Sequence, residues 1–236
     1  QSIRHVIVGK SMKKYALKAG SSPDKIIEIN NGVPLINKII SREKYKSVFN
    51  KYDVCSNDYI LLSLSGLRPL KGIEYLVMAM SQIVRKIPNA KLILACKSDS
   101  YENYIKNLIK TFNLEQNVKF IGFVTDEEEK IVLIRRSDVF CKPSLLEACS
   151  VAILEALKEG KVVIASTPGG IDIITNGRNG ILVRPKDHKD FANKVIEIFQ
   201  DKKLREKIEN NAKNDIINFD IKKTATKYFS LYKDII

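Results

Sequence analysis

The alternation of strand-like and helix-like segments from about residue 59 onward is the feature that most constrains the fold. Short apolar runs occur at residues 59–65, 91–96, 117–123, 138–143, 161–166 and 180–185. Between them lie segments whose apolar residues recur every three or four positions, as from Ile73 to Val84. Strands separated by such helices pair in parallel through right-handed crossovers, and the helices cover both faces. The sequence therefore predicts an α/β fold with a doubly wound, Rossmann-like parallel sheet.

The two ends of the chain do not fit this alternation. Residues 1–35 read as a strand, a helix, a second short strand and the turn "NNGVP", which resembles the tail of another α/β unit followed by a hinge. We assign residues 36–218 to the Rossmann-like domain and residues 219–236 to a final helix. Within the domain, we expect Thr125 to cap the helix that carries the acidic run "DEEE".

The net charge of +13, from 40 basic and 27 acidic residues, favours a polyanionic partner. Nucleic acid, an anionic bilayer surface and phosphorylated substrates all qualify. A basic module that binds nucleic acid would interleave aromatic and basic residues on an exposed face. The aromatic residues here fall mostly at positions expected in the core, and much of the charge alternates with acids at helical spacing. We therefore expect no nucleic-acid partner.

Cysteine and histidine usage excludes several kinds of site. The chain has two histidines and no Cys-x-x-Cys pair, so we expect no metal site and no histidine-based acid–base chemistry. We interpret the cysteines as reduced, buried thiols of a cytoplasmic protein: Cys55, Cys96, Cys141 and Cys149. No apolar run approaches the ~18 residues of a membrane span, which leaves peripheral contact with an anionic membrane face as the one membrane role expected.

Polar residues gather where the predicted strands end. In open α/β sheets, ligands bind beyond the carboxyl ends of the strands. Gly66 permits close backbone approach there, and Arg68 and Lys71 supply positive charge. Ser150 precedes a helix whose free amides favour an anion at Val151. Each signal also has an ordinary interpretation, a plain N-cap for Ser150 and a turn for "PLKG", but their shared position predicts a phosphate site.

Two glutamates with seven residues between them, Glu147 and Glu155, frame this helix. Glu155 lies on the second turn, about 40° around the helix from Val151 at ~100° per residue. A carboxylate there can accept two hydrogen bonds from the hydroxyls of a ribose, and Glu147 would face whatever lies beyond the phosphates. The alternatives are a solvated helix glutamate for Glu155 and an acid pairing with the helix dipole for Glu147.

These stretches resemble the C-terminal, donor-binding half of GT-B retaining glycosyltransferases of family 4, the glycosyl transferases of group 1. The two-glutamate stretch at residues 143–166 is the most specific match; residues 61–80 are similar to the family's Gly-Arg…Lys-Gly stretch, and residues 169–183 to its double-glycine loop. The resemblance covers essentially the whole chain. It implies transfer of a hexose from a nucleotide-diphosphate sugar to an acceptor hydroxyl with retention of configuration, without metal or cofactor, and makes residues 36–218 the donor-binding domain.

The resemblance also implies roles for individual residues. Glu147 would be the catalytic residue, hydrogen-bonded to the donor sugar, while Lys71 would bind the pyrophosphate and Glu155 the ribose. Amides near Ser150 and Val151 would hold the distal phosphate, and the backbone of residues 122–124 would contact the base. The implied donor-binding residues are Gly66, Arg68, Lys71, Gly122, Phe123, Val124, Glu147, Cys149, Ser150, Val151 and Glu155.

Two departures from the family pattern matter. The family's Gly-Arg pair falls on Ser65 and Gly66, so its phosphate arginine is missing and Arg68 is the candidate substitute. Most of the acceptor-binding domain lies outside this chain, so we expect the chain by itself to bind donor without transferring it. The carbohydrate or lipid-linked acceptor would come through that domain. The surfaces meant for it should leave apolar side chains to pack on each other or on a second copy: Ile3, Val6, Leu17, Tyr228 and Leu231.

Two alternatives remain on the same scaffold. One is a regulatory or inactive homologue that binds nucleotide sugars without transferring them. The other is a nonhydrolysing nucleotide-sugar epimerase, which would use several acids and histidines near the donor sugar. The shortage of histidine disfavours the epimerase.

Overall fold

The computed structural model describes residues 4–97 and 100–234. A six-stranded, wholly parallel sheet forms its centre, with strand order β5-β4-β3-β6-β7-β8. The strands are β3 Tyr59–Gly66, β4 Ala90–Lys97, β5 Val118–Phe120, β6 Val139–Lys142, β7 Val162–Ser166 and β8 Ile181–Val183. This confirms the predicted doubly wound parallel sheet.

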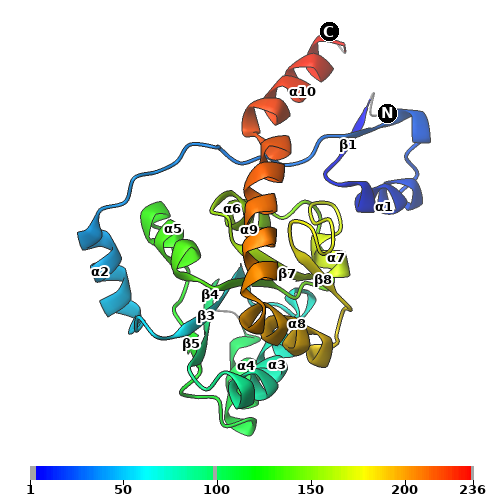
Figure 1. Ribbon diagram of the computed structural model, residues 1–236. Helices are drawn as coiled ribbons and strands as arrows, with labels where there is room; N and C mark the ends of the chain where they lie inside the picture. Colours follow the sequence, from blue (N-terminus) through cyan, green and yellow to red (C-terminus); the bar gives the residue numbers. More distant parts are fainter. Residues whose placement is uncertain (1–3, 98–99, 235–236) are drawn as a thin grey trace.

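Helices cover both faces of the sheet (Figure 1). One face packs against α3 Ile73–Lys86, α4 Glu102–Thr111 and α8 His188–Gln200; the other packs against α2 Arg42–Tyr52, α5 Glu127–Arg136 and α6 Val151–Lys158. Side chains alternate between the two cores along each strand, so that Leu61 belongs to the first core and its neighbour Leu62 to the second. Because both faces are buried, the strands are apolar throughout rather than amphipathic.

Helix α5 begins one residue later than expected. Asp126, not Thr125, is its N-cap: the Asp126 carboxylate accepts hydrogen bonds from the amides of Glu128 at 2.8 Å and Glu129 at 3.1 Å. An aspartate at the N-cap also adds negative charge at the positive end of the helix dipole, which a threonine cannot. The prediction of Thr125 as the cap was therefore wrong by one position.

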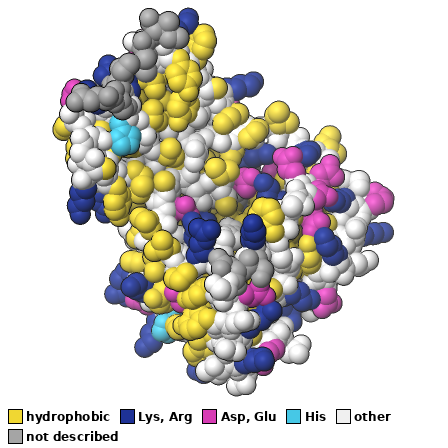
Figure 2. Space-filling model, turned by 180° about the vertical axis from the view of Figure 1, so that it is seen from behind, with side chains coloured by type: hydrophobic (Ala, Val, Ile, Leu, Met, Phe, Trp, Pro, Cys, Tyr) yellow, Lys and Arg dark blue, Asp and Glu magenta, His cyan; other side chains and the backbone are white. Residues whose placement is uncertain are grey.

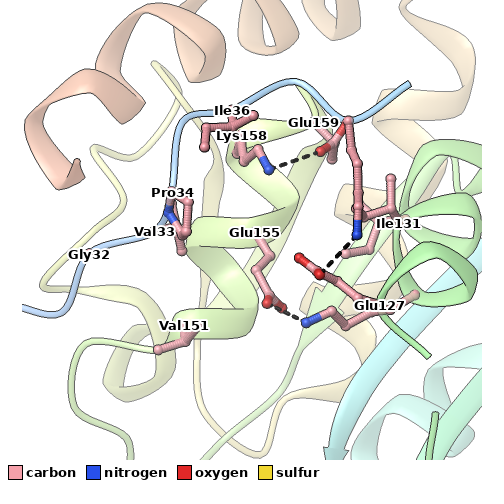
Figure 3. A pocket seen from close by; sticks show the side chains of 13 residues that line it. Gly32, Val33, Pro34, Ile36, Glu127, Ile131, Val151, Glu155, Lys158 and Glu159 are labelled. Atoms are coloured by element: carbon pink, nitrogen blue, oxygen red, sulfur yellow. Dashed lines mark hydrogen bonds and ion pairs between the residues drawn. The ribbon is translucent and has the colours of Figure 1, made fainter. Parts of the chain in front are cut away.

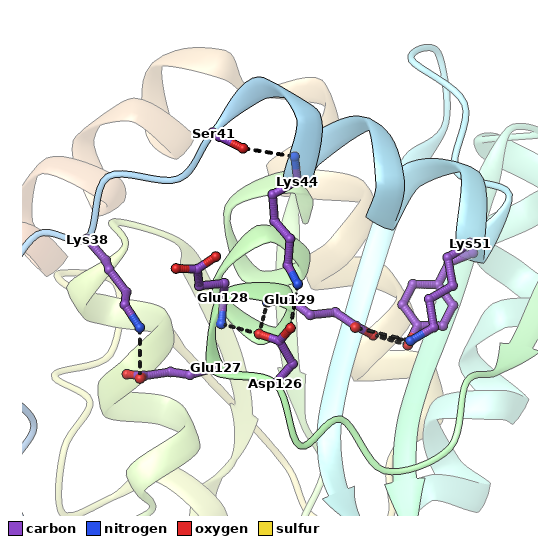
Figure 4. A network of polar contacts seen from close by, with 9 residues as sticks. Lys38, Ser41, Lys44, Lys51, Asp126, Glu127, Glu128 and Glu129 are labelled. Carbon is purple, nitrogen blue, oxygen red and sulfur yellow. Dashed lines mark hydrogen bonds and ion pairs between the residues drawn. The ribbon is translucent and has the colours of Figure 1, made fainter.

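Ion pairs join the segment before α2, and α2 itself, to the start of α5 (Figure 4). Three lysines meet three acids: Lys38 with Glu127, Lys44 with Asp126 and Lys51 with Glu129. The Tyr52 hydroxyl donates a further hydrogen bond to Glu129. The pairs of Lys38 and Lys44 lie at the surface and contribute little individually, whereas Glu129 is buried. Together the three pairs fix how α2 lies along α5.

The N-terminal segment forms a small lobe beside the main sheet (Figure 1). It contains a two-stranded parallel sheet of β1 His5–Ile7 and β2 Ile26–Glu28, with the 3₁₀ turn η1 Lys10–Met12 and the helix α1 Lys13–Lys18 between them. The chain then crosses to α2, and on the way Val33 pairs with the start of the last helix, α10 Ile221–Lys233. The Val33 amide donates to the Phe219 carbonyl at 2.9 Å, so the two end segments are in contact.

The expected apolar surface is only partly present. Leu17 is 40% exposed, but Leu231 is buried at 7%, so its prediction as an unpartnered side chain was wrong. Val6 and Tyr228 are half-buried, and Ile3 lies outside the described residues. The reason is the rotation of α10, which exposes Phe229 and Tyr232 instead: Phe229 is 61% and Tyr232 57% exposed. Figure 2 shows hydrophobic side chains gathered on this upper lobe.

Three further expectations concern the rest of the molecule. Cys96, Cys141 and Cys149 are buried, but Cys55 is exposed because it lies in the surface turn after α2, so the expectation of burial was wrong for Cys55. Basic and acidic side chains are interspersed over the face seen in Figure 2, without one continuous basic area. Across the described ranges, every helix is too short or too polar to reach across a bilayer.

Candidate functional site

The strand order places a topological switch point between β3 and β6. From β3 the chain moves outward through β4 to β5, and then returns to β6 and moves outward the other way through β7 to β8. The loops that follow β3 and β6 therefore diverge at the carboxyl edge of the sheet, which is where such folds bind ligands. The Leu145 amide donates to the Leu70 carbonyl at 2.8 Å and ties the two loops together.

Gly72 permits this close approach of the two loops. Its φ is +64°, and a Cβ added there would lie 2.2 Å from the carbonyl oxygen of Pro143. Any other residue would be strained in its backbone and would push the β6 loop away. Gly72 thus fixes the loop carrying Lys71 against the loop carrying Glu147.

Two lysines converge on the Glu147 carboxylate. Lys71 Nζ lies 2.9 Å and Lys142 Nζ 3.2 Å from the same oxygen, Oε2. The Ser144 hydroxyl lies 3.5 Å from that oxygen, at the limit of hydrogen bonding. The side chains are 26% exposed for Lys71, 19% for Glu147 and 5% for Lys142, so Lys142 is the deepest of the three.

These charges hold Glu147 ionised. Burial acts to raise the pKa of Glu147, but the ammonium groups of Lys142 and Lys71 outweigh burial and lower the pKa below its ordinary value. Burial, together with the charge of Lys71, lowers the pKa of Lys142, while Glu147 opposes that change. The nearby thiol of Cys96 stays protonated, because burial raises its pKa to about 12.

The double-glycine loop, Gly169 and Gly170, packs against the backbone that carries this cluster. A Cβ added to Gly169 would lie 3.1 Å from the Lys142 carbonyl oxygen and 3.3 Å from that of Ser144. The Ser166 hydroxyl also donates to the Ser144 carbonyl. The backbone on both sides of Pro143 is therefore held against the start of the short helix α7 Thr167–Gly170.

Helix α6 points its N-terminus at the same edge of the sheet. Ser150 occupies the N-cap position, but its side chain makes no capping hydrogen bond, and the first turn contains no acidic residue. The first amides of a helix have no partner within the helix. These amides, with the positive end of the helix dipole, are available to an anion near Val151, which is 43% exposed.

A cleft of about 440 Å³ extends from the ends of β3 and β4 to α5 and α6. Its described lining includes Leu64, Ser65, Gly66, Ala95, Lys97, Phe123, Val124, Lys130 and Glu155. Glu155 pairs with Lys130 at 2.5 Å, and the Ser65 hydroxyl is buried without a hydrogen-bond partner within the described chain. Glu155 also borders a second hollow of about 370 Å³ beneath the hinge segment (Figure 3).

Glu147 borders a third hollow, of about 600 Å³, on the side of the N-terminal lobe. Its wall combines Lys10, Lys13 and Lys14 with apolar side chains such as Tyr15 and Leu146. Glu147 and Glu155 therefore line separate hollows, one at the lobe and one at the cleft.

The structure brings together most, but not all, of the predicted site residues. The Cys149 side chain is 2% exposed and its sulfur lies 3.8 Å from the Asn31 carbonyl oxygen, so only its backbone can serve the site. Arg68 is exposed and is not part of the described lining of the cleft. Gly122, with a φ of +75°, turns the chain so that Phe123 reaches the cleft.

Sequence reasoning missed Lys142 and Lys130. Lys142 stands in the apolar run "VFCKP", and a lysine at the end of a buried strand was a usable signal that was not followed. Lys130 had no such signal, because its pairing with Glu155 depends on how α5 lies beside α6. Within the described ranges, no three His, Cys, Asp or Glu side chains gather as a metal site requires.

Comparison with known proteins identifies relatives over most of the chain. An uncharacterized glycosyltransferase of Methanocaldococcus jannaschii is 34% identical over 92% of this chain and 56% of its own length. The UDP-Gal:alpha-D-GlcNAc-diphosphoundecaprenol alpha-1,3-galactosyltransferase of Escherichia coli is 28% identical over 91% of this chain and 55% of its own. The chain thus spans about half the length of these relatives.

A solved structure shares the fold. Anabaena HepE, crystallised with UDP-glucose, superimposes with a TM-score of 0.88 at 23% identity, covering 99% of this chain and 64% of that one. This similarity supports the GT-B assignment of the parallel sheet. The family of glycosyl transferases group 1 matches residues 44–215, nearly the whole of the main domain. The chain belongs to the glycosyl transferases group 1 family.

Proposed function

We propose that this chain is the donor-binding part of a retaining glycosyltransferase and that it holds a nucleotide-diphosphate sugar at the switch point between β3 and β6. The observation that carries the proposal is the convergence, at one edge of the sheet, of Lys71, Glu147 and the open N-terminus of α6. A cleft that ends at Glu155 adjoins these groups.

We expect the donor to lie in one orientation, with its base at the cleft and its sugar at Glu147. The diphosphate lies between Lys71 and the first amides of α6, where charge-assisted hydrogen bonds favour an anion. The base enters the cleft beside Phe123 and Val124, and the ribose hydroxyls donate to Glu155 in competition with Lys130. The sugar then faces Glu147.

The reaction exchanges one bond at the anomeric carbon for another. The bond from this carbon to the diphosphate oxygen breaks, a bond to the acceptor oxygen forms on the same face, and the proton of the acceptor hydroxyl passes to an oxygen of the leaving diphosphate. Lys71 and the α6 dipole stabilise the charge that develops on the leaving diphosphate. The proposal assigns this task to protein groups and requires no metal ion. Glu147 holds a sugar hydroxyl and orients the donor.

A carbohydrate or lipid-linked acceptor would approach from the hollow beside the N-terminal lobe. Its wall of lysines and apolar side chains suits a molecule with both an anionic and an apolar part. The E. coli relative supports this choice, because its name pairs UDP-Gal with a diphosphoundecaprenol-linked acceptor. An acceptor of this kind would bring the protein to an anionic membrane face.

Calorimetry with UDP, GDP, ADP and dTDP tests the proposal. We expect at least one of the four to bind one-to-one, independently of added Mg²⁺, and we expect Lys71→Ala to weaken that binding. Absence of binding to all four would overturn the proposed function. Nucleotide-sugar turnover by the full-length protein separates a transferase from a homologue that only binds.

A further inference from the structure

Lys142 is unlike the other lysines around the site. Lysine is almost never fully buried unless it is paired, yet Lys142 is only 4% exposed at the end of a central strand. It forms an ion pair with Glu147, and that carboxylate is already paired with Lys71. Two ammonium groups around one carboxylate leave the cluster with an excess positive charge.

The arrangement around Glu147 is asymmetric. Oε2 faces both lysines, whereas Oε1 accepts no hydrogen bond from any residue that the structure describes. Lys142 lies on the interior side of the carboxylate, and Lys71 is the more exposed of the two cations. The exposed cation can therefore move without disturbing the buried one.

We propose that Lys142 is a positioning residue, a buried counter-ion that keeps Glu147 ionised and oriented when Lys71 turns to the donor diphosphate. The inference rests on the proposed function, since it presumes that a diphosphate arrives at Lys71. In the empty site both lysines share Oε2 of Glu147. With donor bound, Lys71 contacts the diphosphate, Lys142 retains Oε2, and Oε1 is left to a sugar hydroxyl.

The charges around the cluster favour this exchange of partners. Without Lys142, Lys71 could reach the diphosphate only by leaving a carboxylate that is 19% exposed without any cation. An unpaired charge at such a site is costly. Cys96 and Ser144 are a thiol with a raised pKa and a hydroxyl, so neither can supply the missing charge. Lys10, Lys13 and Lys14 line the same hollow as Glu147, but all three are exposed, and none forms an ion pair with Glu147 among the described contacts.

A double-mutant cycle with UDP as the probe tests the proposal. Lys142→Met keeps most of the length of the side chain and removes its charge; Glu147→Gln removes the charge of the carboxylate. At pH 7.5 we expect Lys142→Met to bind UDP roughly 10-fold more weakly than the unaltered chain, about one charge-assisted hydrogen bond. Glu147→Gln should bind at least as tightly as the unaltered chain, and the double variant should return to within about threefold of it, because Lys71 is then free of Glu147.

A second measurement needs no ligand. Carbon-13 NMR of the Glu147 carboxyl group should give a higher pKa in Lys142→Met than in the unaltered chain, because one of its two cations is gone. Below that raised pKa, Glu147 is protonated and no longer holds Lys71. The UDP deficit of Lys142→Met should therefore shrink as the pH falls through it. The control is Lys91→Met, at the start of β4 and therefore at the edge of the sheet opposite the site. It should change neither the Glu147 pKa nor the affinity for UDP.

Three outcomes would overturn the proposal. An unchanged Glu147 pKa in Lys142→Met would show that Lys142 does not hold the carboxylate. A double variant that binds UDP as weakly as Lys142→Met would show that Lys142 acts without Glu147. A Lys142→Met variant that is unfolded at the assay temperature, to an extent that explains its loss of UDP affinity, and whose affinity Glu147→Gln does not restore, would leave only a structural role for Lys142. If the unaltered chain binds none of the four nucleoside diphosphates, the proposed function fails, while the NMR titration still decides whether Lys142 controls Glu147.

Discussion

Gly72→Ala should destabilise the chain more than replacement of a glycine at which an added Cβ would meet no neighbouring atom. Two features of Gly72, its backbone conformation and a close neighbour, disfavour any side chain. Its φ of +64° is the first constraint, and an alanine in that region is disfavoured by ~1–2 kcal/mol. The second is the Pro143 carbonyl oxygen, 2.2 Å from the position of the new Cβ. Relieving that overlap means moving a loop that is held by the Leu145–Leu70 hydrogen bond and by Gly169. Overpacking of this kind costs ~1–3 kcal/mol.

Gly177→Ala provides the matched control. Gly177 has a φ of +74°, but a Cβ there would meet nothing within 4 Å. This variant therefore carries the backbone strain without the overlap. The effect of alanine on the unfolded chain is common to both variants and cancels in the difference. We expect Gly72→Ala to lower the free energy of unfolding by about 1–3 kcal/mol more than Gly177→Ala.

Urea unfolding of the two variants measures this difference, and UDP calorimetry adds a functional readout. Displacement of Pro143 shifts the loop that carries Glu147, so Gly72→Ala should also weaken UDP binding, whereas Gly177→Ala should not. Equal losses of stability in the two variants would refute the contact between the two loops. A destabilised Gly72→Ala with full UDP affinity would refute the claim that this contact shapes the donor site.

Three further predictions concern the donor site. Lys71→Ala should weaken UDP binding by about 1.5–3 kcal/mol, the contribution of a charge-assisted hydrogen bond, and calorimetry showing unchanged affinity beside a Lys91→Ala control would remove Lys71 from the site. Glu155→Gln should lose more affinity for UDP than for its 2′,3′-dideoxy analogue, because only the former has hydroxyls to donate; equal losses would place Glu155 away from the ribose. UDP affinity should survive EDTA, and a strict requirement for Mg²⁺ or Mn²⁺ would contradict a site built from Lys71 and the α6 N-terminus.

The sequence was sufficient to predict the sheet, and it also predicted that polar residues gather at one edge of that sheet, because both follow from local patterns. Apolar runs alternating with amphipathic segments predict parallel strands, and residues that follow such strands meet at one edge. Lys71, Ser150 and Glu155 were assigned to the candidate site in this way. The order of the strands, which puts β3 beside β6, depends on packing between distant segments and appears only in the structure.

What the sequence could not predict depends on side-chain direction. The resemblance implied Cys149 as a donor-binding residue, but its thiol turns to the carbonyl of Asn31, which leaves only its backbone for the site. Lys130 was overlooked, because the angle between α5 and α6 decides that it meets Glu155. Leu231 was expected at the surface, but the rotation of α10 buries it and exposes Phe229. Each of these features depends on a contact between segments far apart in the sequence.

A crystal structure of the chain with UDP tests the central claim most directly. We predict that the diphosphate lies at the carboxyl edge of the sheet between β3 and β6, with Lys71 Nζ and the amide of Val151 within hydrogen-bonding distance and the ribose hydroxyls on Glu155. Density for UDP in another hollow, such as the one bordered by Lys10 and Asp172, with the switch point empty, would contradict the account.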